Sequence, residues 1–250
     1  MGFVLEACVD SVESAVAAEQ GGATRYELCG NLIIGGTTPD PMLFERVQAR
    51  CVPPVHVLIR PRFGDFCYTQ EEFALMREQV RWFSAHGARA VVIGVLMPDG
   101  RLDRERMARL IDCANGCHIT LHRAFDVCAD PFEAYETAKE LGVDCILTSG
   151  QAADCEQGAA LLAQLIAQKK NGPEILVGAG VNAAAIRRMI PRTGARAFHM
   201  SGKRTYQSEM TFRKEGVPMG LPGISEYEIW RTDAQAIAEA RAVLQEFFGE

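Results

Sequence analysis

The chain has 250 residues, of which 48% are hydrophobic, and a formal net charge of −6. The acidic balance, without a basic block or a stripe of basic and aromatic residues, argues against nucleic acid as the main partner. No apolar run reaches the about 20 residues of a membrane helix, and Met1–Glu6 lacks the basic segment of a secretory signal. Nine scattered cysteines, an odd number, are typical of reduced thiols, so we expect a cytoplasmic protein.

Short apolar segments alternate with helical segments through the first half of the chain. Turn and capping residues separate them, such as Thr69 and Asp103, which we expect to precede helices. The predicted strands are Val4–Val9, Arg25–Cys29, Val55–Arg60 and Ala90–Leu96, and helices are expected at Ser14–Gln20, Met42–Arg50 and after each of the two caps.

The same alternation continues in the second half. The predicted strands are His118–Arg123, Cys145–Ser149, Ile175–Gly178 and Ala197–Ser201. The predicted helices are Pro131–Leu141, Asp154–Lys170, Asn182–Ile190 and Asp233–Phe248. Short, largely apolar strands of this kind are typical of parallel strands that are buried on both faces.

Eight βα units in a chain of this length favour a closed barrel over an open, doubly wound sheet. We therefore predict an α/β fold: a single (β/α)8 TIM-like barrel that spans residues 1–250 and ends in a C-terminal helix. Residues 202–231 form a segment that is too long for an ordinary connection. We expect this segment to be irregular, and to be either a lid over the barrel mouth or an oligomer contact.

Charged or titratable residues lie near the ends of five predicted strands. In such barrels the active site lies at the carboxyl ends of the strands, and residues two apart share a face. Pairs of this kind are Glu6 with Cys8, Glu27 with Cys29, Arg60 with Arg62, and His199 with Ser201. The candidate acid–base residues are Glu6, Glu27, His122, Asp126 and His199. Because an unpaired buried charge is costly, we expect Glu–Arg contacts across the mouth, which are also the purely structural interpretation.

A second group of residues is suited to an anion. Loops after the seventh and eighth strands of such barrels often hold phosphate through backbone N–H groups and a helix N-terminus. The candidate anion-binding residues are Arg60, Arg62, Arg123, Ser149, Gly178, Gly180 and Ser201. Ordinary βα turns also use small residues of this kind, so plain turn chemistry is the alternative.

Two other mechanisms were weighed on the residue types. A Schiff base needs a buried lysine, and no lysine falls inside a predicted strand, which argues against a lysine-dependent aldolase. A divalent metal could be held by Glu6, Glu27, His122 and His199, although Arg60 and Arg123 would compete for the carboxylates.

The cysteines provide a further hypothesis. Cys8 and Cys29 end neighbouring strands, while Cys67 and Cys128 follow the third and fifth strands on the same face. Soft thiolates select Cu(I) or Zn(II), so two or three of these residues could bind a metal ion. Each cysteine alone also fits as a small buried hydrophobe, and the chain has no CxxC cluster.

Several segments together resemble the CutC family of copper homeostasis proteins. They are Leu5-Glu6-Ala7-Cys8, Tyr26-Glu27-Leu28-Cys29, Ile59-Arg60-Pro61-Arg62, Gly64-Asp65-Phe66-Cys67-Tyr68, Gly94-Val95-Leu96, Asp99-Gly100, His122-Arg123-Ala124-Phe125-Asp126, Leu147-Thr148-Ser149-Gly150-Gln151, Gly178-Ala179-Gly180-Val181, and His199 with Ser201. One departure from the pattern is Met200, where small residues are usual; it adds a thioether or changes the packing. The resemblance implies a TIM-like barrel, a cytoplasmic location, a homodimer or higher homo-oligomer, and a link to copper tolerance or Cu(I) binding.

Two functional hypotheses follow. The first is a copper homeostasis protein that binds Cu(I) through Cys8, Cys29, Cys67 and Cys128. The second is an enzyme that acts on a small anionic or phosphorylated molecule at the barrel mouth, with His122 or Glu27 as the acid or base. The expected partner is accordingly a copper ion or a small anionic ligand, and the sequence assigns no reaction.

Overall fold

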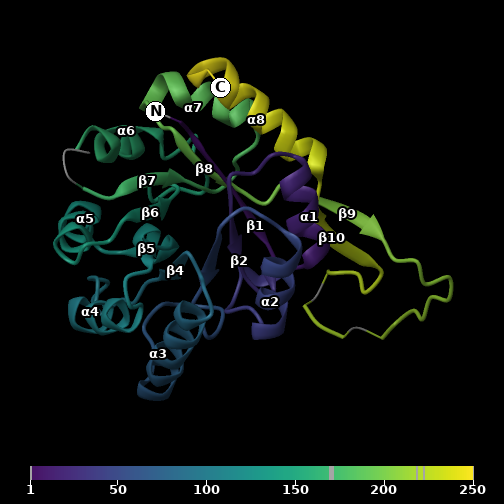
Figure 1. Cartoon of the computed structure of the whole chain (residues 1–250), viewed down its shortest axis with the longest axis horizontal. Coiled ribbons are helices and arrows are strands. Elements are labelled where there is room, and N and C mark those ends of the chain that lie inside the picture. The colour runs from purple at the N-terminus through teal and green to yellow at the C-terminus, as the bar shows by residue number, and fades with distance from the viewer. Residues whose placement is uncertain (1, 169–171, 218, 222, 250) are drawn as a thin grey trace.

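The computed structural model describes residues 2–168, 172–217, 219–221 and 223–249. Its centre is a closed barrel of eight parallel strands, each hydrogen-bonded to the next in chain order, with β8 paired to β1 (Figure 1). The predicted barrel is thereby confirmed. The strands are β1 Val4–Val9, β2 Arg25–Leu28, β3 Val55–Leu58, β4 Ala90–Ile93, β5 His118–Leu121, β6 Cys145–Thr148, β7 Glu174–Val177 and β8 Ala197–Met200.

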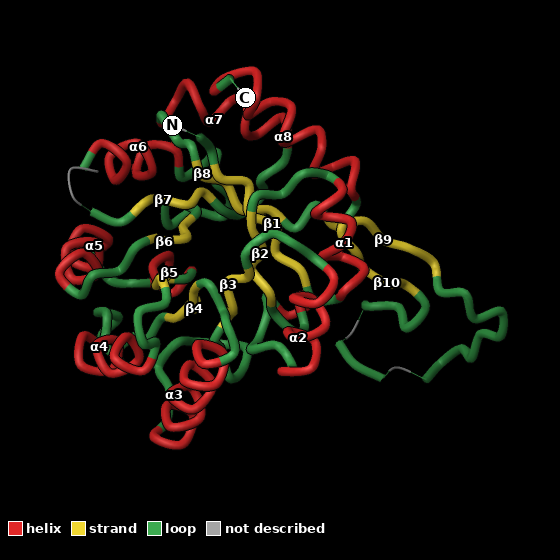
Figure 2. Tube along the Cα trace, viewed as in Figure 1, coloured by secondary structure: helices red, strands yellow, loops and turns green. Residues whose placement is uncertain are grey.

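Helices surround the barrel on the outside (Figure 2). They are α1 Val12–Gln20, α2 Pro41–Arg50, α3 Gln70–Ala85, α4 Arg104–Cys113, α5 Pro131–Glu140, α6 Ala159–Ala167, α7 Ala183–Thr193 and α8 Ala234–Phe248. Thr69 caps α3 in a reciprocal capping box with Glu72, and Asp103 caps α4, as the sequence predicts. None of these helices is long and apolar enough to cross a bilayer.

Alternate residues of each strand pack outward against the helices, which forms the main hydrophobic core. Inside the barrel the apolar contacts fall into two small clusters: Cys145, Leu147, Leu176 and Ala197 in one, and Cys29, Leu58 and Val92 in the other. The interior of such barrels is usually filled with branched apolar side chains. Here Glu6, Glu27 and His56 are buried as well. The barrel interior is therefore partly ionic.

Some predicted boundaries were wrong. β3 ends at Leu58 and β5 at Leu121, because the chain leaves the sheet before Pro61 and turns into a short 3-10 helix, η2 Arg123–Val127. α6 begins at Ala159 rather than at Asp154, and its predicted end at Lys170 lies outside the described residues.

The segment after β8 is not irregular throughout. β9 Lys203–Gln207 pairs antiparallel with β10 Glu228–Thr232. This two-stranded ribbon and its loop project from the barrel beside α1 (Figures 1 and 2). Its base is anchored by Thr232, whose N–H donates to Ser14 Oγ and whose hydroxyl donates to the Ser201 carbonyl.

Candidate active site

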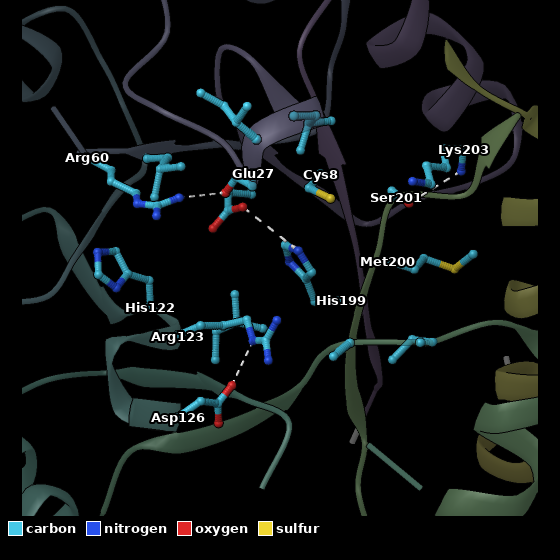
Figure 3. Close-up of a pocket in the computed structure, with 18 of the residues that line it drawn as sticks. Cys8, Glu27, Arg60, His122, Arg123, Asp126, His199, Met200, Ser201 and Lys203 are labelled. Atoms are coloured by element: carbon cyan, nitrogen blue, oxygen red, sulfur yellow. Dashed lines mark hydrogen bonds and ion pairs between the residues drawn. The ribbon is translucent and has the colours of Figure 1, made fainter. Parts of the chain in front are cut away.

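A cavity of about 660 Å³ opens at the carboxyl ends of the strands, and Figure 3 shows its charged lining. The volume suits a small molecule. The structure brings together nine of the residues selected from the sequence as its lining: Cys8, Glu27, Arg60, His122, Arg123, Asp126, Gly180, His199 and Ser201. Of the segment 203–232, Lys203 lines the cavity, and none of the described residues between 208 and 227 does.

A buried chain of acidic and basic groups forms the base of the cavity. His199 Nδ1 lies 2.8 Å from Glu6 Oε1, and its Nε2 lies 3.8 Å from Glu27 Oε2. The second oxygen of Glu6 accepts a hydrogen bond from the Arg25 guanidinium. A Glu–Arg contact is therefore present, but it joins Glu6 to Arg25 outside the cavity lining and does not involve a selected arginine across the mouth.

These contacts set the protonation states. Burial and Glu6 raise the pKa of Glu27 to about 7, despite the opposing effect of His199. Burial opposes charge on His199, but Cys8, Glu27 and Glu6 together raise its pKa well above the ordinary value. Burial also opposes charge on Glu6, whereas Arg25 and His199 lower its pKa below the usual range. Near neutral pH, Glu27 can therefore gain or lose a proton next to a charged imidazole.

Two members of this network were missed in the sequence. Arg25 opens β2 and lies two residues before Glu27, on the same interior face, and this alternation is the signal that could have identified it. His56 was given no role, yet its Nδ1 lies 3.5 Å from Glu6 Oε2. Burial lowers the pKa of His56 to about 4, so the ring is neutral there.

Arg60 and His122 lie together on another side of the cavity (Figure 3). Arg60 donates to the carbonyl oxygens of Gly35, Gly36 and Gly64, at 3.1, 3.0 and 3.0 Å. His122 Nδ1 accepts a hydrogen bond of 3.1 Å from the Ala124 N–H. Burial and the nearby Arg60 lower the pKa of His122 to about 3, so this imidazole is neutral.

Asp126 and Arg123 shape the loops after β5 and β6. Arg123 Nε lies 2.7 Å from Asp126 Oδ2, and its Nη2 donates to Ser149 Oγ at 3.2 Å. The Asp126 carboxylate also accepts from the N–H groups of Ser149 and Gln151. Asp126, which was selected as a catalytic candidate, is thus occupied by loop contacts, and Ser149 lies behind the lining.

The loop after β7 reaches the cavity in a left-handed backbone conformation. Ala179 and Gly180 have φ values of 67° and 72°, and both line the cavity. A Cβ atom at Gly178 would lie 2.7 Å from Leu147 Cδ1, so a side chain at this position would have to displace that methyl group. Lys203 adds a positive charge to the lining, with its Nζ 3.6 Å from the centre of the Trp230 ring.

Arg62 lies outside the cavity lining. Its guanidinium pairs with Glu72 at 2.7 Å and with Asp65 at 3.0 Å. The chain leaves the strand before Pro61, so the rule that residues two apart share a face does not extend from Arg60 to Arg62.

The four selected cysteines are dispersed. Cys8 lines the cavity within reach of His199, and the neighbouring Cys29 is buried with its thiol 3.5 Å from the Val9 carbonyl. Cys67 is exposed on its loop. Cys128 is buried outside the lining, with its sulfur 3.3 Å from Gln151 Nε2. For a soft metal ion, the cavity therefore offers the Cys8 thiol, with Cys29 and His199 beside it.

The residues proposed for a divalent metal meet in part. Among the described residues, one group of potential metal ligands has donor atoms within 4.8 Å of one another: Glu6, Glu27 and His199. His122 is not part of it. Arg25 already pairs with Glu6, so it competes with a cation for that carboxylate.

Comparisons with known proteins agree with the resemblance seen in the sequence. The CutC family model matches residues 3–204. The chain is 39% identical to the copper homeostasis protein cutC homolog of Mus musculus, over 98% of this chain and 90% of that protein. It is 41% identical to a CutC family protein of Klebsiella pneumoniae, over 96% of this chain and 97% of that protein.

Solved structures give the same result. The CutC protein of Streptococcus agalactiae superposes with a TM-score of 0.75 and 27% identity, covering 80% of this chain and 98% of that one. A thiamine phosphate pyrophosphorylase from Pyrococcus furiosus superposes with a TM-score of 0.58 over 99% of this chain and 98% of that one. At 16% identity, this likeness shows a shared fold alone. The family model and the relatives across nearly the full length lead to one conclusion: this chain belongs to the CutC family.

Proposed function

We propose that the barrel mouth is the active site of an enzyme that moves a proton on a small anionic molecule. The observation that carries the proposal is the position of Glu27 and His199: both face one cavity that also has Arg60 and Lys203 in its lining. A general acid or base is most effective when its pKa lies near the working pH, and burial raises that of Glu27 to about 7.

Each member of the network has a role in this proposal. Glu27 takes or returns the proton at the reacting carbon or oxygen of the substrate. His199 faces Glu27 and carries a positive charge that Glu6 stabilises at 2.8 Å. That charge stabilises negative charge that develops on the substrate. Arg25 holds Glu6 in place and keeps it ionised.

Deuterium exchange can test this proposal without knowledge of the reaction. Small phosphorylated and carboxylate metabolites are incubated with the protein in D₂O and analysed by mass spectrometry. We expect the wild type to exchange a C–H proton of at least one compound. Glu27→Gln should abolish the exchange, whereas Arg104→Met, on an exposed ion pair of α4, should retain it. Exchange that persists in Glu27→Gln would overturn the role of Glu27.

A second candidate is Cu(I) binding in copper homeostasis. It is supported by the names of relatives such as the mouse protein, and by the thiol of Cys8 inside the cavity. Thiolates select Cu(I) among metal ions. The ion would be held by Cys8 with Cys29 or His199, and would be cargo that the protein buffers in the cytoplasm, where thiols stay reduced.

An anaerobic competition titration against a Cu(I) chelator tests this second candidate. Cys8→Ser should weaken binding, and Cys29→Ser should weaken it less or equally. Cys113→Ser, at the end of α4, is the matched control and should change nothing. If the wild type binds no more tightly than Cys8→Ser, the site is not at the barrel mouth.

We also propose that the ribbon 203–232 contacts a second copy of the chain. A two-stranded ribbon is marginally stable alone, yet this one exposes large apolar side chains, among them Phe212 and Met219. Light scattering should report an oligomer for the wild type and a smaller species for Phe212→Ser/Met219→Ser. Val52→Ser, equally exposed but on the barrel, should leave the mass unchanged.

A further inference from the structure

Two buried nitrogen atoms on one side of the cavity have no hydrogen-bond partner: Arg60 Nε and His122 Nε2. Their neighbours are satisfied, because the terminal nitrogens of Arg60 donate to three glycine carbonyls and His122 Nδ1 accepts from Ala124. Buried polar atoms are nearly always paired, so an orphan pair at the same place requires an explanation.

Both nitrogens are hydrogen-bond donors. The guanidinium Nε of arginine always carries a proton. In a neutral imidazole one nitrogen donates and the other accepts; since Nδ1 of His122 accepts, the proton is on Nε2. The two residues are close together, because one phenyl ring, that of Phe66, contacts both. Its centre is 5.2 Å from Arg60 Cζ and 4.8 Å from the centre of the His122 ring.

The charge of this pair is also uncompensated. Among the described residues, Arg60 has only carbonyl oxygens and the Phe66 ring as partners, whereas Arg25, Arg62 and Arg123 each pair with a carboxylate. Two N–H donors on residues that contact the same ring, with one net positive charge, match the two oxygens of a carboxylate.

We propose that Arg60 and His122 form a subsite for the carboxylate of the ligand, which identifies the substrate of the proposed enzyme as a small carboxylic acid. Its carboxylate accepts from Arg60 Nε and His122 Nε2, and the rest of the molecule extends toward Glu27 and His199 (Figure 3). Because both nitrogens are buried, the acid reaches them by displacing the Phe66 ring, which contacts both residues. That the acid is a substrate rests on the proposed function, whereas binding of its carboxylate at Arg60 and His122 does not.

Nuclear magnetic resonance of histidine labelled with ¹⁵N measures this binding in the wild type. The Nε2 signal of His122, assigned by its loss in His122→Asn, is followed during titration with lactate, malonate, lactamide and inorganic phosphate. We expect a saturable shift with lactate and malonate, none with lactamide, and a weaker effect with phosphate. Lactamide has the shape of lactate without the charge, so it separates the carboxylate from mere occupancy.

Variants locate the subsite. His122→Asn keeps an acceptor for the Ala124 N–H and removes the Nε2 donor; Arg60→Lys keeps the charge and removes Nε. Each should weaken malonate binding, measured by calorimetry, by about tenfold or more, as expected for a hydrogen bond to a charged group. Arg62→Gln, outside the lining, should bind malonate as the wild type does.

Some outcomes would overturn the proposal. No shift at tens of millimolar acid, an equal shift with lactamide, or tighter binding of phosphate would each show that the orphan donors do not select a carboxylate. The proposed function can fail separately. If malonate binds through Arg60 and His122 but no acid undergoes exchange in D₂O, the subsite stands and the enzyme does not. If an acid exchanges in D₂O but does not shift the His122 Nε2 signal, the enzyme stands and the carboxylate subsite does not.

Discussion

His199 and His122 are buried at the same cavity, yet they hold opposite charge states. Burial alone lowers the pKa of both rings. On the side of β1, β2 and β8, two carboxylates surround His199 and keep it protonated. On the side of β3 and β5, a guanidinium lies near His122, and no ion pair of His122 is found among the described residues. The charged neighbours of each ring, and not its burial, therefore decide whether the histidine is protonated.

The difference gives the cavity a direction. One side is rich in carboxylate oxygens and the other in N–H donors without acceptors. A ligand that bridges them needs a negative group at Arg60 and His122 and a proton to exchange at Glu27. This polarity arises because Glu6 and Glu27 form ion pairs on one side, whereas donors of Arg60 and His122 have no partner on the other. Substitutions that remove an ion pair or a free donor should therefore change the polarity.

The largest effect is expected at Arg25. Arg25→Met leaves the Glu6 carboxylate buried without its guanidinium, since Glu6 is 1% exposed. Removing one partner of a buried ion pair typically destabilises a protein by about 3–5 kcal/mol. Urea unfolding should show a loss of this size.

An exposed ion pair provides the control for that measurement. Arg104 and Glu140 are paired on the surface, with side chains that are 58% and 57% exposed. Arg104→Met should therefore cost less than about 1 kcal/mol. A loss at Arg25 as small as the loss at Arg104 would mean that Glu6 is neutral or hydrated, and that the carboxylate side is not organised by Arg25.

The sequence could predict the barrel and half of the site, for a clear reason. The alternation of strands and helices encodes the fold locally, and strand ends in a barrel converge wherever the strands are placed. Glu27, His122 and His199 were therefore selected, and all three line the cavity. Arg25 was missed because it is the first residue of its strand. The rule that places active sites at the carboxyl ends of the strands does not select residues at their amino ends.

Some selected residues lie outside the cavity for a different reason, which is where the chain leaves the sheet. Arg62 lies beyond the end of β3, so its side chain pairs with Glu72 on α3. Cys67 and Cys128 lie on loops whose direction no periodicity encodes. The orphan donors could not be predicted at all, because a missing partner becomes visible only when every neighbour is in place.

The two histidines should also respond in opposite ways to pH. The pKa of His122 in the folded protein, about 3, lies below the value of 6.5 for the unfolded chain. The unfolded chain therefore takes up the proton first, and this residue's contribution to stability is lost as the pH falls below about 6.5. His199 has a raised pKa, so its contribution is present below pH 6.5 and is lost as the pH rises.

Urea unfolding at several pH values can isolate the effect of His122. Between pH 6.5 and 5, the wild type should lose about 2 kcal/mol more than His122→Asn, because only the wild type has the buried ring that resists protonation. Above pH 6.5 the two proteins should follow parallel curves. If the curves are parallel at acid pH too, His122 has a solvent-accessible ring and the two sides do not differ in the way described.

Gly94 offers a steric test of the donor side. A Cβ atom at this position would lie 2.5 Å from His122 Cε1 and 2.7 Å from Nδ1. Gly94→Ala should therefore displace the ring, with a cost of about 1–3 kcal/mol for overpacking. It should also weaken malonate binding while the His199 signal stays unchanged. Gly220→Ala, where a Cβ atom meets nothing within 4 Å, is the control. A wild-type malonate affinity in Gly94→Ala would mean that the ring position is irrelevant to binding.

The smallest effect is expected at Arg62, and it separates the two arginines of the Arg60-Pro61-Arg62 segment. Arg62→Gln removes partly exposed ion pairs with Glu72 and Asp65, which should cost about 1 kcal/mol or less. Because Arg62 lies outside the cavity, Arg62→Gln should not change the affinity for malonate. Arg60→Lys, two residues away, keeps the positive charge but should lower that affinity. Calorimetry on the two variants makes the comparison. Equal losses would show that the subsite attracts anions through net positive charge alone, and that the orphan donors of Arg60 and His122 have no directional role.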